Sequence, residues 1–474
     1  MSYIQFLGAA GVVTGSKHLI NTANGNPGMQ VLVDCGLFQG LKEWRLRNWQ
    51  DLPIPPRNID AVILTHAHLD HSGWIPRLVK AGFRGPIYAT QATIDFCGIL
   101  LPDSGHLQEE DAAFHNKHKT SKHHPALPLY TFAEAQQSLQ YFRPVKYEEV
   151  VQVSPEMSFR FVRAAHMLGS SMAEITLNSN GSSRRLLFTG DIGRVRDSTV
   201  APGEVVYSGP AKGEATDVLV MESTYGNRLH PTNDPRPELA KLIRETVARG
   251  GSVVVPAFAV ERTQKFLFIL KELMDSGQIP HVPVHTDSPM AIQAINIFLK
   301  HAEEFTPATK ELIARSGSPL SWPDFHFDTT PEQSKKINDS RYPTIIVSSS
   351  GMVTGGRVQH HLMLRLPDPR NLVLFIGFQA QGTRGATIKS GAKEVKIFGQ
   401  VVPIRAQVVA LEQFSDHADT PELLQWLRTF PQPPQATYLV HGDPDSAAAL
   451  RQTMVQSLHW NVEVAKWMEQ VPIK

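Results

Sequence analysis

The chain has 474 residues, of which 42% are hydrophobic and 19% are charged, and its 46 Lys and Arg residues nearly balance its 45 Asp and Glu residues. This length suffices for two or three domains, and the composition is that of a globular protein rather than a disordered one. A net charge of +1 gives no argument for nucleic-acid binding, so any basic surface must be local.

Membrane-spanning and disulfide-rich classes are also excluded. No apolar run reaches the roughly 20 residues of a membrane span. The N-terminal segment Met1–Gly8 lacks the basic region of a signal peptide and is expected to form a first strand. Only Cys35 and Cys97 occur, and both are expected to be buried rather than reactive. Together these features favour a reducing, cytoplasmic location without a thiolate metal site.

Short apolar runs recur along the chain, each followed by a residue suited to metal binding or acid–base chemistry. In chain order these are Val31–Val33 before Asp34, Ala61–Leu64 before His66, Phe159–Val162 before His166, Leu186–Phe188 before Asp191, Val218–Met221 before Glu222, and Thr437–Val440 before His441. Short continuous apolar runs are typical of buried strands. Functional residues at strand ends indicate a layered α/β architecture.

The middle of the chain has a different pattern. Helical periodicity over Pro237–Arg249, Glu261–Leu273 and Met290–Lys300 alternates with the strand-like runs Ser252–Val255, Val282–His285, Thr344–Val347 and Leu372–Ile376. Such alternation predicts βαβ units on a largely parallel sheet. We therefore expect residues 226–411 to be a second α/β domain, inserted into a first domain formed by residues 1–225 and 412–474.

A polar segment, Gly105–Tyr130, contains five histidines. They are His106, His115, His118, His123 and His124. Their spacing matches no ligand template, so we expect a solvated or lid-like loop, with an additional metal site as the alternative.

The run from His66 to His71 concentrates potential metal ligands in one turn. His66 and His68 alternate along an extended segment and can point the same way, and Asp70 and His71 follow as the chain turns. Crowded imidazoles repel when protonated and a buried carboxylate costs desolvation, but a bound cation reverses both penalties. One metal cannot easily use all four residues, whereas two metals can, with Asp191 as the natural bridge. Imidazole and carboxylate without thiolate suit zinc, with manganese or iron as competitors.

At this point the sequence resembles a known family. The run Thr65–His71, then His166, then Thr189–Asp191 resembles the metallo-β-lactamase superfamily. The resemblance extends to its β-CASP nuclease branch through three further residues and through the insert between them. These are Glu222 in Glu-Ser-Thr-Tyr-Gly, His417 in Phe-Ser-Asp-His, His441 in Leu-Val-His-Gly, and the insert segments Pro256–Gln264, Thr286–Met290 and Ser348–Met352.

This resemblance implies a metallo-β-lactamase αββα sandwich with an inserted α/β β-CASP domain on a mainly parallel sheet. It further implies two Zn²⁺ ions, with Mn²⁺ as a substitute, that share a bridging hydroxide. One ion would be held by His66, His68 and His166, the other by Asp70, His71 and His441, with Asp191 between them. Asp70 is counted among the catalytic residues as well. Asp34 would orient a ligand imidazole such as His66 from behind, unless it is only a turn residue.

Two residues beyond the ligands are expected to carry proton transfer. His417 is the candidate general acid for the leaving oxygen, aimed by Glu222. The alternatives are that Glu222 is an exposed acid and that His417 belongs to the start of a helix capped by Asp416 or Ser415.

The small-residue loop that contains Ser349, Ser350, Gly351 and Arg357, together with Arg262, is the candidate substrate-binding region. Backbone amides in such a loop can cradle phosphate and arginine can add charge. The alternative is a tight turn with no ligand.

The resemblance implies a metal-dependent ribonuclease that hydrolyses phosphodiester bonds of single-stranded RNA. It would act mainly as an endonuclease, with 5′→3′ exonuclease activity as a secondary expectation, and no membrane association; a homodimer is plausible. The alternatives are a DNA nuclease of the repair type, a thioester hydrolase of the glyoxalase II type and a non-enzymatic scaffold subunit. His441 favours RNA over DNA, and the long insert with Glu222 and His417 disfavours a thioesterase.

Overall fold

The computed structural model describes residues 2–22, 28–121, 123–179, 182–194, 211–231, 234–305, 310–311, 314, 322–339, 342–377, 379 and 381–473. The chain forms two compact units. In their described parts, unit 1 comprises 2–194, 211–229 and 416–473, and unit 2 comprises 230–415. That these units coincide with folding domains bounded at 226 and 411 stays a prediction.

Unit 1 contains two seven-stranded sheets. The first has the order β22-β1-β2-β3-β4-β5-β6, and its strands are β1 (Tyr3–Phe6), β2 (His18–Asn21), β3 (Gln30–Val33), β4 (Ala61–Ile63), β5 (Ile87–Ala89), β6 (Phe142–Pro144) and β22 (Gln470–Pro472). The second has the order β21-β20-β11-β10-β9-β8-β7, and its strands are β7 (Val151–Ser154), β8 (Met157–Arg163), β9 (Ser171–Ser179), β10 (Ser182–Phe188), β11 (Val218–Glu222), β20 (Ala436–Val440) and β21 (Val462–Val464). The apolar runs recognised in the sequence thus form strands of these sheets.

The two sheets pack face to face through one apolar core. Ile4 and Val33 of the first sheet belong to the same cluster as Phe159, Phe161 and Phe188 of the second, and none of the five is more than 1% exposed. Removing one such side chain from water contributes roughly 1.5–3 kcal/mol. This core fixes the separation of the sheets and therefore the spacing of the residues at their edges.

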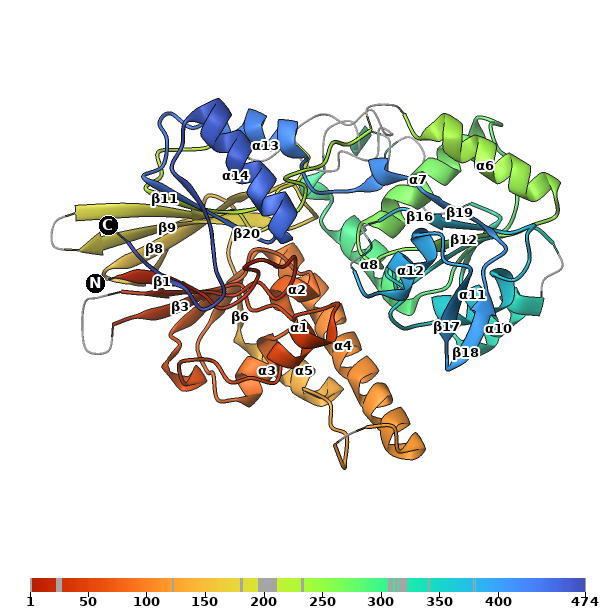
Figure 1. Cartoon of the computed structure of the whole chain (residues 1–474), viewed down its shortest axis with the longest axis horizontal. Helices are drawn as coiled ribbons and strands as arrows, with labels where there is room; N and C mark the ends of the chain where they lie inside the picture. Colours follow the sequence, from red (N-terminus) through yellow and green to blue (C-terminus); the bar gives the residue numbers. More distant parts are fainter. Residues whose placement is uncertain are drawn as a thin grey trace. The chain divides into compact units, whose positions relative to one another are not determined.

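Helices cover the outer faces of both sheets. On the second sheet lie α13 (Thr420–Leu427) and α14 (Pro444–Leu458), which share a core cluster with its strands. On the side of the first sheet lie α1 (Lys42–Arg47), α2 (Leu69–Ser72), α3 (Ile75–Lys80), α4 (Gln91–His118) and α5 (Phe132–Ser138) (Figure 1). The chain of this unit also forms two short helices, η1 (Pro56–Asn58) and η2 (Leu139–Tyr141). The expected αββα sandwich is confirmed.

Unit 2 is built on a six-stranded sheet of order β14-β13-β15-β12-β16-β19, in which every strand pairing is parallel. Its strands are β12 (Val253–Pro256), β13 (Val284–Thr286), β14 (Phe325–Phe327), β15 (Ile345–Ser348), β16 (Leu372–Phe375) and β19 (Gln407–Ala410), beside a hairpin of β17 (Glu394–Ile397) and β18 (Gln400–Pro403). Its helices are α6 (Arg236–Ala248), α7 (Arg262–Asp275), α8 (Pro289–Lys300), η3 (Ala302–Glu304), α10 (Pro331–Asp339), α11 (Val358–Arg365), α12 (Arg384–Lys389) and η4 (Glu412–Phe414). The predicted α/β insert on a parallel sheet is confirmed.

The expected loop over Gly105–Tyr130 is wrong for its first half, because α4 continues to His118. Residues of high helix propensity fill this stretch. The helix also packs against the segment that follows: Tyr130 donates a hydrogen bond to Ser104, and the backbone amide of Leu129 donates one to Gln108. A polar helix with a weak apolar stripe is easily mistaken for a loop. Among the described helices, none combines the length and apolarity needed to cross a membrane.

Candidate active site

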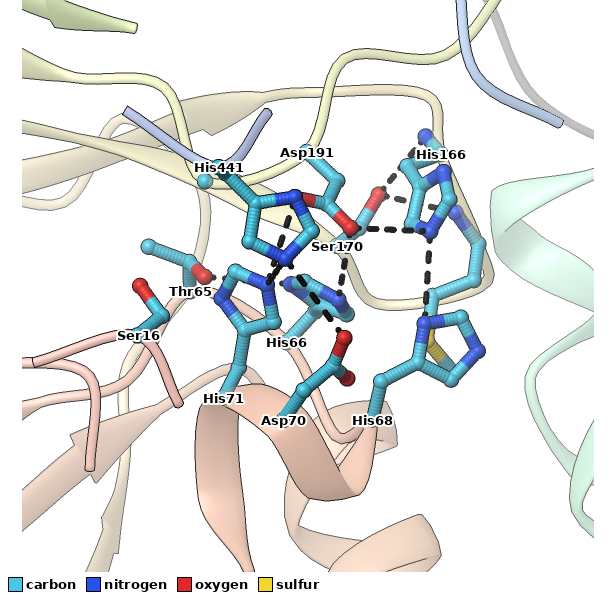
Figure 2. Close-up of polar contacts among 12 residues, drawn as sticks. Ser16, Thr65, His66, His68, Asp70, His71, His166, Ser170, Asp191 and His441 are labelled. Atoms are coloured by element: carbon cyan, nitrogen blue, oxygen red, sulfur yellow. Dashed lines mark hydrogen bonds and ion pairs between the residues drawn. The ribbon is translucent and has the colours of Figure 1, made fainter. Parts of the chain in front are cut away.

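The candidate ligands of unit 1 meet because the strands that precede them end at one edge of each sheet. In the first sheet, β3 and β4 are parallel and lead to Asp34 and to His66. In the second sheet, β10, β11 and β20 are parallel neighbours, and β8 runs in the same direction. Their carboxyl ends deliver Asp191, Glu222 and His441, together with His166 after β8. Figure 2 shows the side chains of His66, His166, Asp191 and His441 lying close together.

The first group of ligand atoms comes from His66, His68, His166 and Asp191. One ligand atom from each residue lies within 4.8 Å of the others. His68 Nδ1 is 3.3 Å from His166 Nε2, and Asp191 Oδ2 is 3.6 Å from His66 Nε2 and 3.5 Å from His166 Nε2. The set has the donor composition of a zinc, manganese or iron site.

The second group comes from Asp70, His71 and His441. His71 Nε2 and His441 Nε2 are 3.1 Å apart, and Asp70 Oδ2 is 3.5 Å from His441 Nε2. The other oxygen of Asp191, Oδ1, is 3.2 Å from His71 Nε2 and 3.4 Å from His441 Nδ1. Asp191 therefore presents one oxygen to each group.

Three observations fit these groups to cations. His66 Nε2 is buried without a hydrogen-bond partner, which is costly unless something outside the protein binds it. His71 Nε2 and His441 Nε2 aim at one point at a separation close to the roughly 3.4 Å expected for two nitrogens on one tetrahedral zinc. Burial, reinforced by neighbouring cationic groups, lowers the pKa of His66 and of His166 well below the ordinary value, so both imidazoles are neutral and able to bind a metal.

Two members of the second group keep a charge. Burial alone would lower the pKa of His71, but the carboxylates of Asp191 and Asp34 outweigh it and raise this pKa well above its usual value. Burial alone would raise the pKa of Asp70, but His441 and His71 lower it to about 2. Without a cation, the site is thus balanced by a proton on His71, which a metal would have to displace.

Asp34 lies behind the candidate ligands and contacts one of their imidazoles, which is His71 and not the His66 named as an example. Asp34 Oδ2 accepts a hydrogen bond from His71 Nδ1 at 2.6 Å, so this carboxylate orients His71 rather than His66. It reaches His66 only through Thr65, whose hydroxyl lies 3.0 Å from Asp34 Oδ2 and 3.1 Å from His66 Nδ1. The left-handed backbone at Asp34 (φ 60°) turns the chain sharply as β3 ends.

Sequence reasoning missed two threonines whose hydroxyls contact the imidazoles of candidate ligands. Thr65 joins Asp34 to His66, and the hydroxyl of Thr224 lies 3.1 Å from His441 Nδ1. Each is adjacent to a recognised motif, Thr65 directly before His66 and Thr224 two residues after Glu222. A threonine adjacent to a candidate ligand motif could have been predicted to contact an imidazole of the site, because such hydroxyls commonly orient ligand rings.

Glu222 and His417 form a second polar pair beside Asp191. Both oxygens of Glu222 are 3.2 Å from His417 Nδ1, and His417 Nε2 is 4.0 Å from Asp191 Oδ2. Glu222 is fully buried and accepts backbone hydrogen bonds from Ile192 and Thr224. The alternative of an exposed acid is excluded for Glu222. The alternative of a helix capped by Asp416 or Ser415 is wrong, because the N-cap of α13 is Asp419 and His417 lies before it.

Two glycines let the segment around Asp191 lie against the rest of the site. A Cβ on Gly190 would lie 2.6 Å from the hydroxyl of Thr65, and one on Gly193 would lie 1.6 Å from the carbonyl oxygen of Ala165. Gly193 also forms an isolated antiparallel bridge with His417. The segment from 190 to 193 thereby positions Asp191 and His417 together.

The predicted substrate-binding residues all belong to unit 2. Arg262 begins α7, and Ser349, Ser350 and Gly351 follow β15, with Arg357 at the end of the same loop. Ser349 Oγ is buried without a hydrogen-bond partner, a feature that a ligand oxygen could satisfy. Arg357, in contrast, uses its guanidinium within the unit, donating to Asp287 at 2.7 Å and to the carbonyl oxygens of Asp328 and Thr329.

The αββα fold with histidine and carboxylate ligands at one edge defines a metallo-hydrolase class, and comparison with family models agrees. Residues 25–92 match the metallo-β-lactamase superfamily, residues 263–388 match the Beta-Casp domain, and residues 401–465 match the Zn-dependent metallo-hydrolase RNA specificity domain. Similarity to individual proteins extends over nearly the whole chain. The protein belongs to the metallo-β-lactamase superfamily, in the branch that carries the β-CASP domain.

Three curated relatives illustrate this similarity. The chain is 34% identical to "Ribonuclease TTHA0252" of Thermus thermophilus, over 98% of this chain and 99% of that protein. It is 31% identical to an "RNase J-like protein" of Methanocaldococcus jannaschii, over 90% of each chain. It is 31% identical to "Transcription termination factor FttA" of Methanosarcina mazei, over 96% of this chain and 69% of that protein.

One solved structure shares the fold along the whole chain. It is a protein of unknown function from Enterococcus faecalis, with a TM-score of 0.51 at 14% identity, covering 99% of both chains. At that identity the likeness supports the fold alone.

Proposed function

We propose that this protein is a metal-dependent ribonuclease that hydrolyses phosphodiester bonds of single-stranded RNA. The observation that carries the proposal is the Glu222–His417 pair, buried beside Asp191 and the two ligand groups. A thioesterase or lactamase needs the ligands but not this additional proton donor. The similarity to a protein named as a ribonuclease, 34% over 98% of this chain, supports the same choice.

The donor sets favour two zinc ions, with manganese as a substitute. His66, His68 and His166 would hold one ion, Asp70, His71 and His441 the other, and the two oxygens of Asp191 would serve both. When bound, the two cations supply a water of lowered pKa as the nucleophile and positive charge for the phosphate oxygens.

The chain's own residues then contribute positioning and proton transfer. Asp34 accepts the Nδ1 proton of His71 and so keeps Nε2 of that ring directed at the second group. Glu222 accepts from His417 Nδ1, which favours the protonated imidazole and leaves Nε2–H facing the side of Asp191. From that atom His417 would give its proton to the leaving 3′-oxygen, a contribution of typically about 10²–10⁴-fold in rate. Asp70 is proposed to act in catalysis by balancing the charge of the second group.

Unit 2 is proposed to bind the substrate backbone through Arg262 and the loop of Ser349, Ser350 and Gly351. The unpartnered hydroxyl of Ser349 supports this role for the loop. For Arg357 we propose an indirect role, in which its bonds to Asp287 and to neighbouring carbonyls hold the end of the loop.

The mode of cleavage is also a proposal. Mainly endonucleolytic cleavage, with 5′→3′ exonuclease activity in addition, is inferred from the family.

A cytoplasmic location is proposed as well, and it agrees with Cys35 and Cys97, which are both free and buried. Burial raises the pKa of each thiol to about 12, so neither is a reactive thiolate. A homodimer is proposed, and its test is the mass of the purified protein in solution.

A cleavage assay tests the function. Purified protein with Zn²⁺ is offered labelled single-stranded RNA, single-stranded DNA, duplexes of each, and a thioester. We expect cleavage of single-stranded RNA, abolished by a chelator and restored by Zn²⁺. Preferential cleavage of DNA would support the repair-type alternative, and hydrolysis of the thioester without cleavage of any nucleic acid would contradict the proposal.

A further inference from the structure

An arginine and a glutamate of unit 1 join the two segments that carry Asp191 and His417. The Nε atom of Arg194 donates to both carboxylate oxygens of Glu422, at 3.1 Å and 3.3 Å. The Glu422 side chain is 2% exposed and that of Arg194 is 18% exposed, so the pair is largely removed from water. Hydrogen bonds between two charged groups are stronger than those between neutral groups and more demanding in geometry.

Glu422 connects this pair to the backbone next to His417. Its Oε2 accepts a hydrogen bond from the backbone amide of Asp419 at 3.0 Å, and Asp419 Oδ1 accepts one from the amide of Glu422 at 3.1 Å. This capping box begins α13 and fixes the backbone at Asp419, two residues after His417. The carboxylate that binds Arg194 is therefore the same one that holds the segment of His417.

The segment that ends at Arg194 pairs with the backbone around His417. Gly193 and His417 form an isolated antiparallel bridge, and the amide of Ala418 donates to the carbonyl oxygen of Ile192 at 2.9 Å. A short pairing of two strands is marginal on its own. The ion pair that follows it therefore contributes to holding the two segments in register.

The direction of the His417 imidazole and its distance from the ligand groups are set by different contacts. Both oxygens of Glu222 lie 3.2 Å from Nδ1 of this ring, which directs Nε2 away from Glu222. Nε2 lies 4.0 Å from Asp191 Oδ2, and this distance depends on how segments 192–194 and 416–419 pair. A displacement of about 1 Å at a reacting group can reduce a rate about 10²-fold.

We infer that Arg194 and Glu422 are positioning residues for the proton donor of the reaction, and hold His417 where its Nε2–H reaches the leaving 3′-oxygen. This inference rests on the proposed ribonuclease function and adds two residues to it. His417 gives its proton to that oxygen as the phosphorus–oxygen bond breaks, so the ribose leaves as a neutral alcohol. Arg194 and Glu422 act only through His417.

A leaving group that needs no proton separates this role from a general structural one. The substrates are an RNA and the same RNA with sulfur in place of the leaving 3′-oxygen at one bond. Thiols are much stronger acids than alcohols, so the sulfur leaves as a thiolate without a proton donor. His417→Ala is the positive control, because it should lose cleavage of the oxygen substrate and keep cleavage of the sulfur substrate.

Arg194→Lys is the main variant, because lysine keeps a charge near the buried carboxylate but not the geometry of the guanidinium. Alanine would leave Glu422 buried without this cation. We expect kcat for the oxygen substrate to fall about 10- to 100-fold with KM unchanged. Cleavage of the sulfur substrate and metal content by elemental analysis should both stay at their wild-type values.

Glu422→Gln provides a second variant, since its amide oxygen still accepts from the backbone of Asp419 and so retains the helix cap. It should show the same selective loss as Arg194→Lys. Because the two residues act as one unit, the double variant should be no worse than the poorer single variant.

Arg160→Lys is the matched control. Arg160 Nε lies 3.1 Å from Glu174 Oε1, with side chains 22% and 9% exposed, in a pair between β8 and β9 of the same unit. The carboxylate partners of Arg160 are Glu148, Glu174 and Glu214, none of which is a candidate ligand. This variant should cleave both substrates as the wild-type protein does.

Equal losses on the oxygen and sulfur substrates in Arg194→Lys would make the pair a general support of the fold and overturn the inference. Cleavage of both substrates at the level of Arg160→Lys would also overturn it. In either case the proposed function stands, because the wild-type protein cleaves RNA. If the wild-type protein cleaves neither substrate, the proposed function fails and the inference fails with it.

Discussion

Each unit contains a buried polar cluster, and the two clusters differ in whether their polar atoms have hydrogen-bond partners within the protein. In unit 1 the cluster around Asp191 leaves the buried Nε2 atom of His66 without a hydrogen-bond partner. In unit 2 the cluster around Asp287 is complete: one oxygen accepts from Arg357 at 2.7 Å, and the other accepts from His361 at 2.7 Å and from Ser334 at 2.6 Å.

This difference in hydrogen bonding distinguishes a candidate binding site from a cluster that serves the fold. A buried polar cluster with unmet partners depends on something the chain does not supply, whereas a cluster that satisfies itself stabilises the fold. Sequence motifs alone do not make this distinction, since both clusters lie in family-like segments. We therefore expect substitutions in the first cluster to affect metal and activity, and substitutions in the second to affect stability.

The largest effect is expected for Asp191→Asn. This change keeps the shape of the side chain but removes the charge that faces both ligand groups. We expect most bound metal to be lost and activity to fall by at least about 10³-fold, equivalent to about 4 kcal/mol. Metal content by elemental analysis and the RNA cleavage rate measure the two effects. Retention of two metals with near-normal activity would contradict the bridging position of Asp191.

Arg357→Ala tests the second cluster. Removing this arginine leaves Asp287 buried without its cation, and we expect a loss of about 3 kcal/mol in the free energy of unfolding of unit 2. Hydrogen exchange of the α11 amides in urea measures it. Lys389→Ala is the matched control, since it breaks an exposed pair with Glu412 worth about 0–1 kcal/mol. Loss of bound metal without loss of stability would show that the two clusters are not separate.

Asp34→Asn should weaken metal binding without abolishing it. The variant retains a side chain beside His71 Nδ1 but loses the charge that orients this ring. We expect zinc affinity to fall about 10- to 100-fold, measured by competition with a chelator. Asp60→Asn, which alters a backbone contact to Gln30 remote from the ligands, should leave the affinity unchanged. Equal affinities for both variants would make Asp34 a turn residue only.

The smallest effect concerns pH and the metal-free protein. Burial lowers the pKa of His18 from 6.5 to about 3. Below pH 6.5 the unfolded chain therefore binds a proton at His18 that the folded chain does not bind. As the pH is lowered, this difference decreases the free energy of unfolding by about 1.4 kcal/mol per pH unit. His71 has the opposite sign, but its contribution is complete below pH 6.5 and does not mask this slope. His18→Gln should flatten the dependence of unfolding free energy on pH by that amount, and an unchanged slope would contradict the account.

The fold and the convergence of the candidate ligands could be predicted because short apolar strands lead to the segments that carry these residues. Within each sheet, parallel strands place their carboxyl ends together, so functional residues were expected to gather at strand ends. The inserted sheet could be predicted because helical periodicity alternates with short strand-like apolar runs.

The features that could not be predicted depend on local turns and on packing between segments rather than on sequence motifs. Which imidazole Asp34 would orient is decided by the turn after β3, and this turn selects His71. The helical form of residues 105–118 depends on packing against α5, which a weak apolar stripe did not reveal.

The most direct test of the account is a joint measurement of metal content and RNA cleavage in His417→Ala. If His417 is the proton donor aimed by Glu222, the variant should keep the wild-type number of metal ions while its cleavage rate falls about 10²–10⁴-fold. Loss of metal together with activity would instead make His417 a ligand, and wild-type activity would remove it from the mechanism.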